Sequence, residues 1–180
     1  ILGGWDHLAF VLCLCLLARG RYLLALVTTF TIGHSLSLAL AFFDIVKVPV
    51  PPVEAVIALS IAFMAREAIR ARAEDMADPH RRRRQLAVVA GFGLLHGLGF
   101  ATVLRELGVA PDERLSGLLF FNGGVELGQL IFVGCVLGVM KLAAIFDRDQ
   151  WVRQAALYGA GIVDCFWMIE RVAGFTLGTA

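Results

Sequence analysis

Six long apolar stretches, separated by short charged or proline-containing segments, constrain the fold of this chain more than any other feature of its sequence. Each stretch can cross a hydrocarbon core ~30 Å thick as a helix rising ~1.5 Å per residue, provided that the first is short and the others tilt. We therefore predict an all-α, polytopic membrane helix bundle of about six transmembrane helices, forming one domain over residues 1–180. The expected spans are residues 2–18, 22–43, 53–69, 86–107, 115–146 and 154–173.

The composition supports this prediction, because 59% of the residues are hydrophobic and the mean hydropathy is +0.79. An ordinary soluble domain is about half apolar and has too little interior to bury more. The cysteines lie within apolar stretches and show no C-x-x-C spacing, so we interpret them as packing residues. They are Cys13, Cys15, Cys135 and Cys165.

Positive charge is distributed unevenly between the expected loops. Twelve of the 16 lysines and arginines fall on one side of a six-span topology, including the run Arg81 to Arg84. The positive-inside rule assigns this side to the cytoplasm and places both termini on the other side. Because no aromatic residue or recognition motif accompanies the basic run, we interpret it as a topology anchor and predict no nucleic-acid partner. The chain enters an apolar helix directly from Ile1, without an initiator Met or a signal peptide, so we expect the natural protein to continue upstream.

Two segments of the sequence resemble each other. Residues 30–39 and 92–101 share the pattern F-x-x-x-H-[SG]-L-[SG]-x-A, which aligns His34 with His96. A Val-Glu pair follows in the next helix each time and supplies Glu54 and Glu126. We interpret this similarity as a repeated helical hairpin, with spans two and three matched to spans four and five about an axis along the membrane normal.

Several ionisable residues lie within the expected spans. Such residues cost several kcal/mol unless they face the protein interior or water, so they are functional candidates. Counted at ~1.5 Å per residue from the outer boundary, four of them lie roughly 13 to 16 Å deep, and the others lie nearer the outer mouth. The deep residues are His34, His96, Glu126 and Asp164; the shallower ones are Asp6, His7 and Glu54. The sequence therefore predicts a site near the bilayer midplane.

The fifth span adds two amides to this set. Asn122, Glu126 and Gln129 are spaced i, i+4 and i+7, which places them on one helical face, and we expect that face to point inward. Glycines flank both His96 and Glu126. They either let neighbouring helices pack closely or let a helix unwind locally beside an ion.

Imidazole nitrogens and carboxylate oxygens are ligands that suit Ni, Co, Zn, Fe and Mn, so histidines and carboxylates at one depth predict a divalent-metal site. The same residues also fit a purely structural role. A histidine inside a membrane often hydrogen-bonds a neighbouring helix, which contributes about 1 kcal/mol, and a His–Glu pair can hold two helices together.

A series of motifs resembles the HupE/UreJ family, in particular its HupE/UreJ-like second branch. The motifs are Gly4-Trp-Asp6-His7-Leu-Ala-Phe10, Phe30-Thr-Ile-Gly-His34-Ser-Leu-Ser-Leu38, Glu54-Ala-Val-Ile-Ala-Leu-Ser60-Ile, Phe92-Gly-Leu-Leu-His96-Gly-Leu-Gly-Phe100 and Phe121-Asn122-Gly-Gly-Val-Glu126-Leu-Gly-Gln129. The resemblance implies a multi-pass protein of the bacterial inner membrane, associated with nickel or a similar divalent metal. It assigns the family's Asp-His motif to Asp6 and His7 and its later histidines to His34 and His96. In the family a further histidine precedes the first motif, and its position would lie upstream of Ile1.

Our leading hypothesis is a permease-like protein that binds a divalent metal ion such as Ni, Co, Zn or Fe. In this hypothesis the outer residues Asp6, His7 and Glu54 attract the ion and remove its water. The deeper residues His34, His96 and Glu126 hold it, Asn122 and Gln129 orient those ligands, and Asp164 supports the site. Protonation of the histidines or of Glu126 would couple release of the ion to the proton gradient.

Two other hypotheses remain open at this point. The same cluster could activate water on a bound metal, as in a hydrolase-type intramembrane enzyme that acts on a lipid. Alternatively, the chain is a membrane scaffold without metal, and a periplasmic upstream domain carries the function.

Overall fold

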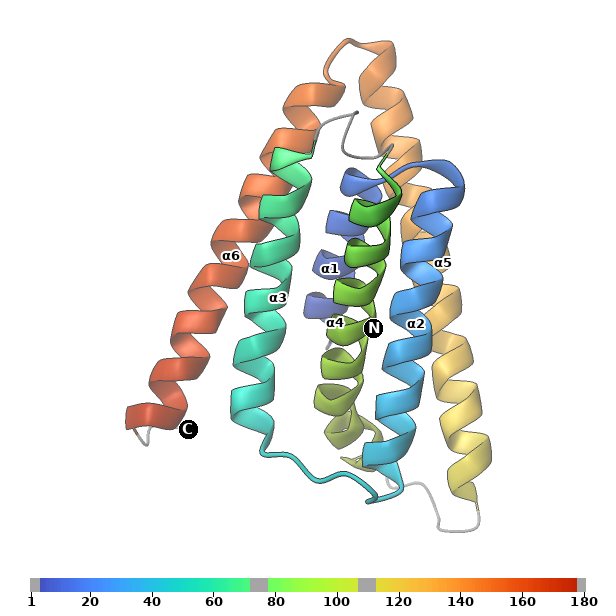
Figure 1. Cartoon of the computed structure of the whole chain (residues 1–180), viewed down its shortest axis with the longest axis vertical. Coiled ribbons are helices and arrows are strands. Elements are labelled where there is room, and N and C mark those ends of the chain that lie inside the picture. Colours follow the sequence, from blue (N-terminus) through green and yellow to red (C-terminus); the bar gives the residue numbers. More distant parts are fainter. Residues whose placement is uncertain (1–3, 72–77, 107–112, 178–180) are drawn as a thin grey trace.

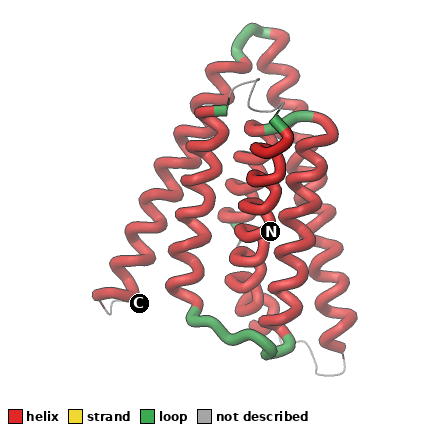
Figure 2. The backbone as a smooth tube through the Cα atoms, in the orientation of Figure 1, coloured by secondary structure: helices red, strands yellow, loops and turns green. Residues whose placement is uncertain are grey.

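The structure, a computed structural model, describes residues 4–71, 78–106 and 113–177, and within these ranges it contains helices and no strands. The prediction of an all-α protein with six helices is confirmed (Figures 1 and 2). The helices are α1 (Trp5–Leu17), α2 (Gly20–Phe42), α3 (Val50–Arg70), α4 (Pro79–Glu106), α5 (Arg114–Ile145) and α6 (Asp149–Leu177).

The helices run up and down beside one another, with α2 against α4 and α3 against α6 (Figure 1). The α1–α2 connection, the end of α3, the start of α4 and the α5–α6 turn lie together at the upper end in Figure 1. The α2–α3 connection and the end of α6 lie toward the opposite end. Consecutive helices run in opposite directions, and the most extensive packing joins helices that are not consecutive in the sequence.

The first helix is the short, buried element of the bundle. It has 13 residues, whereas α2 has 23, and it begins about half-way along the bundle (Figure 1). Nearly every side chain from Phe10 to Leu17 is buried. A helix that is apolar on all sides lies in a protein core or in lipid, and neighbouring helices cover this one.

Glycines set the distance between α2 and α4. A Cβ atom added to Gly93 would lie 2.5 Å from the Phe30 carbonyl oxygen, and one added to Gly33 would lie 2.7 Å from the Ala90 carbonyl oxygen. A Cβ atom on Gly97 would overlap the His34 carbonyl oxygen. Close packing is therefore the role of these glycines, in agreement with the first of the two interpretations of the glycines around His96. This packing brings together the helices that carry the two similar segments.

The surface of the bundle is apolar, and α5 shows this most clearly. Its buried side chains are few, and large apolar residues such as Leu119, Phe120 and Ile131 are exposed along it. By length and composition, α2 and α5 are the two helices of the described chain that are apolar enough to cross a membrane, and α1 is apolar but shorter. An apolar surface of this extent favours a lipid environment.

A polar contact at the upper end of the bundle gives a stability prediction. Tyr22 of α2 donates a 2.6 Å hydrogen bond to Oε1 of the buried Gln85 of α4. We expect Tyr22→Phe to lower the free energy of unfolding by about 1 to 2 kcal/mol, because the buried amide oxygen then loses its donor. Unfolding of the detergent-solubilised protein measures this loss. Tyr158→Phe, at an exposed tyrosine of α6, is the control and should change stability by less than about 0.5 kcal/mol.

Candidate functional site

Three histidines from three helices meet inside the bundle. They are His7 of α1, His34 of α2 and His96 of α4, and all three are buried. The ring centroid of His7 lies 4.8 Å from that of His34 and 4.9 Å from that of His96. His34 and His96, which we expected at one depth, lie together with His7 in one cluster.

His7 lies deeper than its place in the sequence suggests. We expected it nearer the outer mouth, but α1 starts about half-way along the bundle and holds His7 in its first turn, beside the other two histidines. Aromatic rings close the cluster. Phe10 stacks on Phe30 at 4.6 Å, and Phe100 contacts the His7 ring at 4.8 Å between centroids.

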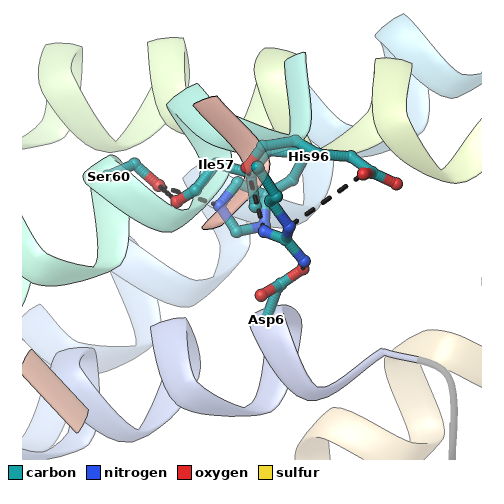
Figure 3. A network of polar contacts seen from close by, with 6 residues as sticks. Asp6, Ile57, Ser60 and His96 are labelled. Carbon is teal, nitrogen blue, oxygen red and sulfur yellow. Dashed lines mark hydrogen bonds and ion pairs between the residues drawn. The ribbon is translucent and has the colours of Figure 1, made fainter. Parts of the chain in front are cut away.

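The hydrogen bonds of Ser60 fix the tautomer of His96 (Figure 3). The Ser60 hydroxyl donates its single proton to the carbonyl oxygen of Ile57 at 2.6 Å, and its oxygen lies 3.0 Å from Nε2 of His96. Nε2 must therefore carry the proton and donate to Ser60. The lone pair of the His96 ring is consequently on Nδ1, which has no hydrogen-bond partner among the described residues.

His7 and His34 share a hydrogen bond of 3.2 Å between Nε2 of His7 and Nδ1 of His34. One of these nitrogens donates and the other accepts, so one of the two rings keeps a free lone pair on its outer nitrogen. Those outer nitrogens, Nδ1 of His7 and Nε2 of His34, are buried without a partner in the part of the chain that the structure describes. Unpartnered polar atoms in a protein interior are uncommon, and these nitrogens can take a water molecule, a proton or an ion as partner.

A small cavity of about 50 Å³ adjoins this pair of histidines. A water molecule occupies ~30 Å³ in the liquid, so the cavity has room for an ion or a water but not for a lipid headgroup. Besides the two histidines, its walls are Gly4, Leu8, Phe100, Phe121, Val125, Gly128 and Gln129.

The two carboxylates expected at the outer mouth bind an arginine instead of standing free. Nη2 of Arg171 in α6 lies 2.9 Å from Oδ2 of Asp6, and its Nη1 donates a 2.9 Å hydrogen bond to the backbone oxygen of Glu54. Nε of Arg171 also lies 4.0 Å from Oε2 of Glu54. Figure 3 shows Asp6 in this network of polar contacts.

The expected polar face of α5 is only partly directed inward. Gln129 is buried, and its Oε1 accepts a 3.3 Å hydrogen bond from Thr31; Oδ1 of Asn122 accepts one of 3.2 Å from Ser35. Glu126 is exposed and does not line the cavity, although Val125 and Gly128 do. The reason is the peripheral position of α5, which buries a narrow strip of its surface, and Glu126 lies beside that strip.

Asp164 of α6 lies in the interior but apart from the hydrogen bonds of the histidines. It is 1% exposed, and both of its carboxyl oxygens lack a partner among the described residues. It interacts electrostatically with Cys13 and Asp6 of α1 and with Arg171 of its own helix.

As they stand, the described residues contain no group of three or more His, Cys, Asp and Glu side chains that could hold a metal ion. The hydrogen bonds explain this result. His7 and His34 point ring nitrogens at each other, and His96 points Nε2 at Ser60. A metal ion would therefore require the rings to turn.

Two residues of this site were not predicted from the sequence. Ser60 belongs to the motif that begins at Glu54, but we had assigned it no role. Arg171 was counted only as a cation on the outer side. Its pairing with Asp6, 165 residues earlier, depends on tertiary structure.

The chain belongs to the HupE/UreJ family: the family model described as "HupE / UreJ protein" matches residues 1–171. This confirms the resemblance seen in the motifs, and it makes the chain a member of a membrane family. No curated protein and no solved structure matches the chain.

Proposed function

We propose that this chain binds a divalent transition-metal ion, nickel or cobalt first, at His7, His34 and His96 and moves it across the bacterial inner membrane. The family is associated with nickel and cobalt transport. The observation that carries the proposal is the meeting of three buried imidazoles from three helices, each with an unpartnered ring nitrogen. Neutral imidazole is a common ligand of such metals.

The spacing of the two ring nitrogens fits a shared proton and is also compatible with a shared metal ion. Two nitrogens bound to one ion at ~2.0–2.1 Å lie ~2.9 Å apart at a right angle and ~3.3–3.4 Å apart at the tetrahedral angle. The His7–His34 distance of 3.2 Å falls between these values. Both rings would have to turn before their lone pairs could point toward a common ion.

The cavity favours ion handling over lipid chemistry. About 50 Å³ beside His7 and His34 accepts an ion or a water molecule, whereas a lipid substrate needs far more room. The remaining ligands of the proposed site are Asp6 and Glu126, with Glu54, Asn122, Gln129 and Asp164 in supporting roles. Glu126 would reach the ion only if α5 turned its exposed side inward.

A scaffold role is the second candidate, because the histidines already hydrogen-bond each other and Ser60 without a metal. Purified protein in liposomes separates the two functions. A transporter accumulates Ni²⁺ or Co²⁺ inside vesicles that hold a metal-sensitive dye, at a rate above protein-free vesicles. A scaffold binds neither ion and gives the background rate, which would overturn the proposal.

Ser60 is expected to position the His96 ring, so its replacement should have a smaller effect on metal binding than replacement of a ligand. We expect Ser60→Ala to weaken Ni²⁺ binding by about 10-fold, because the His96 ring loses the acceptor that fixes its tautomer and orientation. Equilibrium dialysis with elemental analysis measures the affinity. Ser116→Ala, at an exposed serine near the start of α5, is the control and should leave the affinity unchanged. Equal affinities for both variants would contradict this role.

A further inference from the structure

We propose that Arg171 is a tethered cation that occupies the outer carboxylates Asp6 and Glu54 and must leave them before a divalent ion reaches the histidines. The inference rests on the proposed function and names a residue that would control access of the ion to the histidines. Arg171 lies outside the motifs that carried the family resemblance, which end at Gln129.

The contacts of Arg171 place its charge where an incoming ion would be captured. Its guanidinium lies 2.9 Å from the Asp6 carboxylate and 4.0 Å from that of Glu54, and the backbone oxygen of Glu54 accepts a further 2.9 Å hydrogen bond. These are the two carboxylates expected to attract a metal ion at the outer mouth. With Arg171 in place, the Asp6 carboxylate is paired at 2.9 Å, and the same positive charge lies at 4.0 Å from the Glu54 carboxylate.

Arg171 also lies close enough to His96 to interact with it electrostatically. A positive charge near the imidazoles opposes the approach of a divalent cation, and more so where water is scarce. Arg171 therefore opposes an incoming ion in two ways, by pairing with carboxylates that would attract the ion and by repelling the ion from the imidazoles.

Asp6 links the two parts of the site. It precedes His7 in α1, so a movement of Arg171 away from Asp6 frees a carboxylate beside a proposed ligand. One carboxyl oxygen of Asp6, Oδ1, is already buried without a partner among the described residues. Trp167, one turn earlier in α6, lies 5.8 Å from the guanidinium and offers its ring face as an additional contact for the cation.

The test compares the Ni²⁺ affinity of variants in which this charge is removed or kept. We expect Arg171→Gln and Arg171→Met to bind Ni²⁺ at least ~10-fold more tightly than the wild type, because the competing charge is gone. Arg171→Lys keeps the charge and should stay within about 3-fold of the wild type. Equilibrium dialysis of the purified protein with NiCl₂ alone measures all four affinities.

Arg153 provides a matched control. It stands on the same helix and also holds α6 to α1 and α3, through hydrogen bonds to the backbone oxygens of Leu16 and Ala68, but it pairs with no carboxylate in these contacts. Arg153→Gln should therefore lower thermal stability in the same way as Arg171→Gln while leaving Ni²⁺ affinity unchanged.

The possible results separate this inference from the proposed function. If the wild type binds Ni²⁺ and the neutral Arg171 variants bind it no more tightly, Arg171 only holds the helices together and the inference is overturned, whereas the metal site stands. If neither the wild type nor any variant binds Ni²⁺ or Co²⁺, the proposed function fails and the inference fails with it.

Discussion

Replacing His96 with alanine is expected to weaken Ni²⁺ binding by at least about 100-fold and to reduce uptake into liposomes to the background rate. His96 contributes one of the three imidazoles of the proposed site. Loss of a residue that only hydrogen-bonds a metal ligand already lowers metal affinity by ~10- to 100-fold, so loss of a ligand should cost more. Equilibrium dialysis measures the affinity and the metal-sensitive dye measures uptake.

Two further variants make this result interpretable. His96→Gln keeps an N–H group that can donate to Ser60 but has no imidazole, so it should lose nickel as His96→Ala does while retaining more of the packing. His80, the one histidine outside the cluster, is exposed near the start of α4, and His80→Ala should behave as wild type. If His96→Gln binds and transports nickel normally, the imidazole of His96 is not a ligand.

The helices could be predicted from the sequence because the cause of their formation is local. Apolar stretches long enough to span a membrane, interrupted by charge and proline, indicated six helices, and six are present. The equal depth of His34 and His96 could also be predicted, because the depth of each follows from counting residues along its segment. The rise of a helix converts sequence position into height, so residues at one height on neighbouring helices become candidates for contact.

The direction in which each side chain points around its helix was harder to predict than the helices themselves. Asn122, Glu126 and Gln129 span only about 60° of the helix circumference at 100° per residue, which identifies a face but not its edges. Since α5 packs at the periphery, the buried strip includes Gln129 and excludes Glu126. The position of the strip depends on the neighbouring helices, and no local pattern in α5 encodes it.

The depth of His7 and the partner of Asp6 were missed for related reasons. Both depend on where α1 starts relative to the rest of the bundle, and a short apolar helix can slide along its neighbours without changing its own pattern. Arg171 fixes one register of α1 against α6 through Asp6. Long-range ion pairs of this kind become visible only when the helices are assembled.

Gly93→Ala is expected to lower the stability of the bundle and the affinity of the site together. The new Cβ atom would lie 2.5 Å from the carbonyl oxygen of Phe30 and 3.2 Å from the backbone nitrogen of His34. Because both atoms belong to the backbone of α2, no side chain can move aside and the helices must separate. Overpacking of this kind costs ~1–3 kcal/mol. Thermal unfolding in detergent and Ni²⁺ dialysis measure the two effects.

Gly91, which lies two residues before Gly93 and so on nearly the opposite face of α4, supplies the control for this prediction, since a Cβ atom there would have nothing within 4 Å. Gly91→Ala should be neutral or stabilising by up to about 1 kcal/mol, because alanine favours the helix over glycine. The contrast links the fold to the site: His34 and His96 stand on the two helices that Gly93 holds together, so separating the helices separates the imidazoles. If the two alanine variants unfold at the same temperature, α2 and α4 are not in close contact at Gly93, and the distance between the histidines is set by something else.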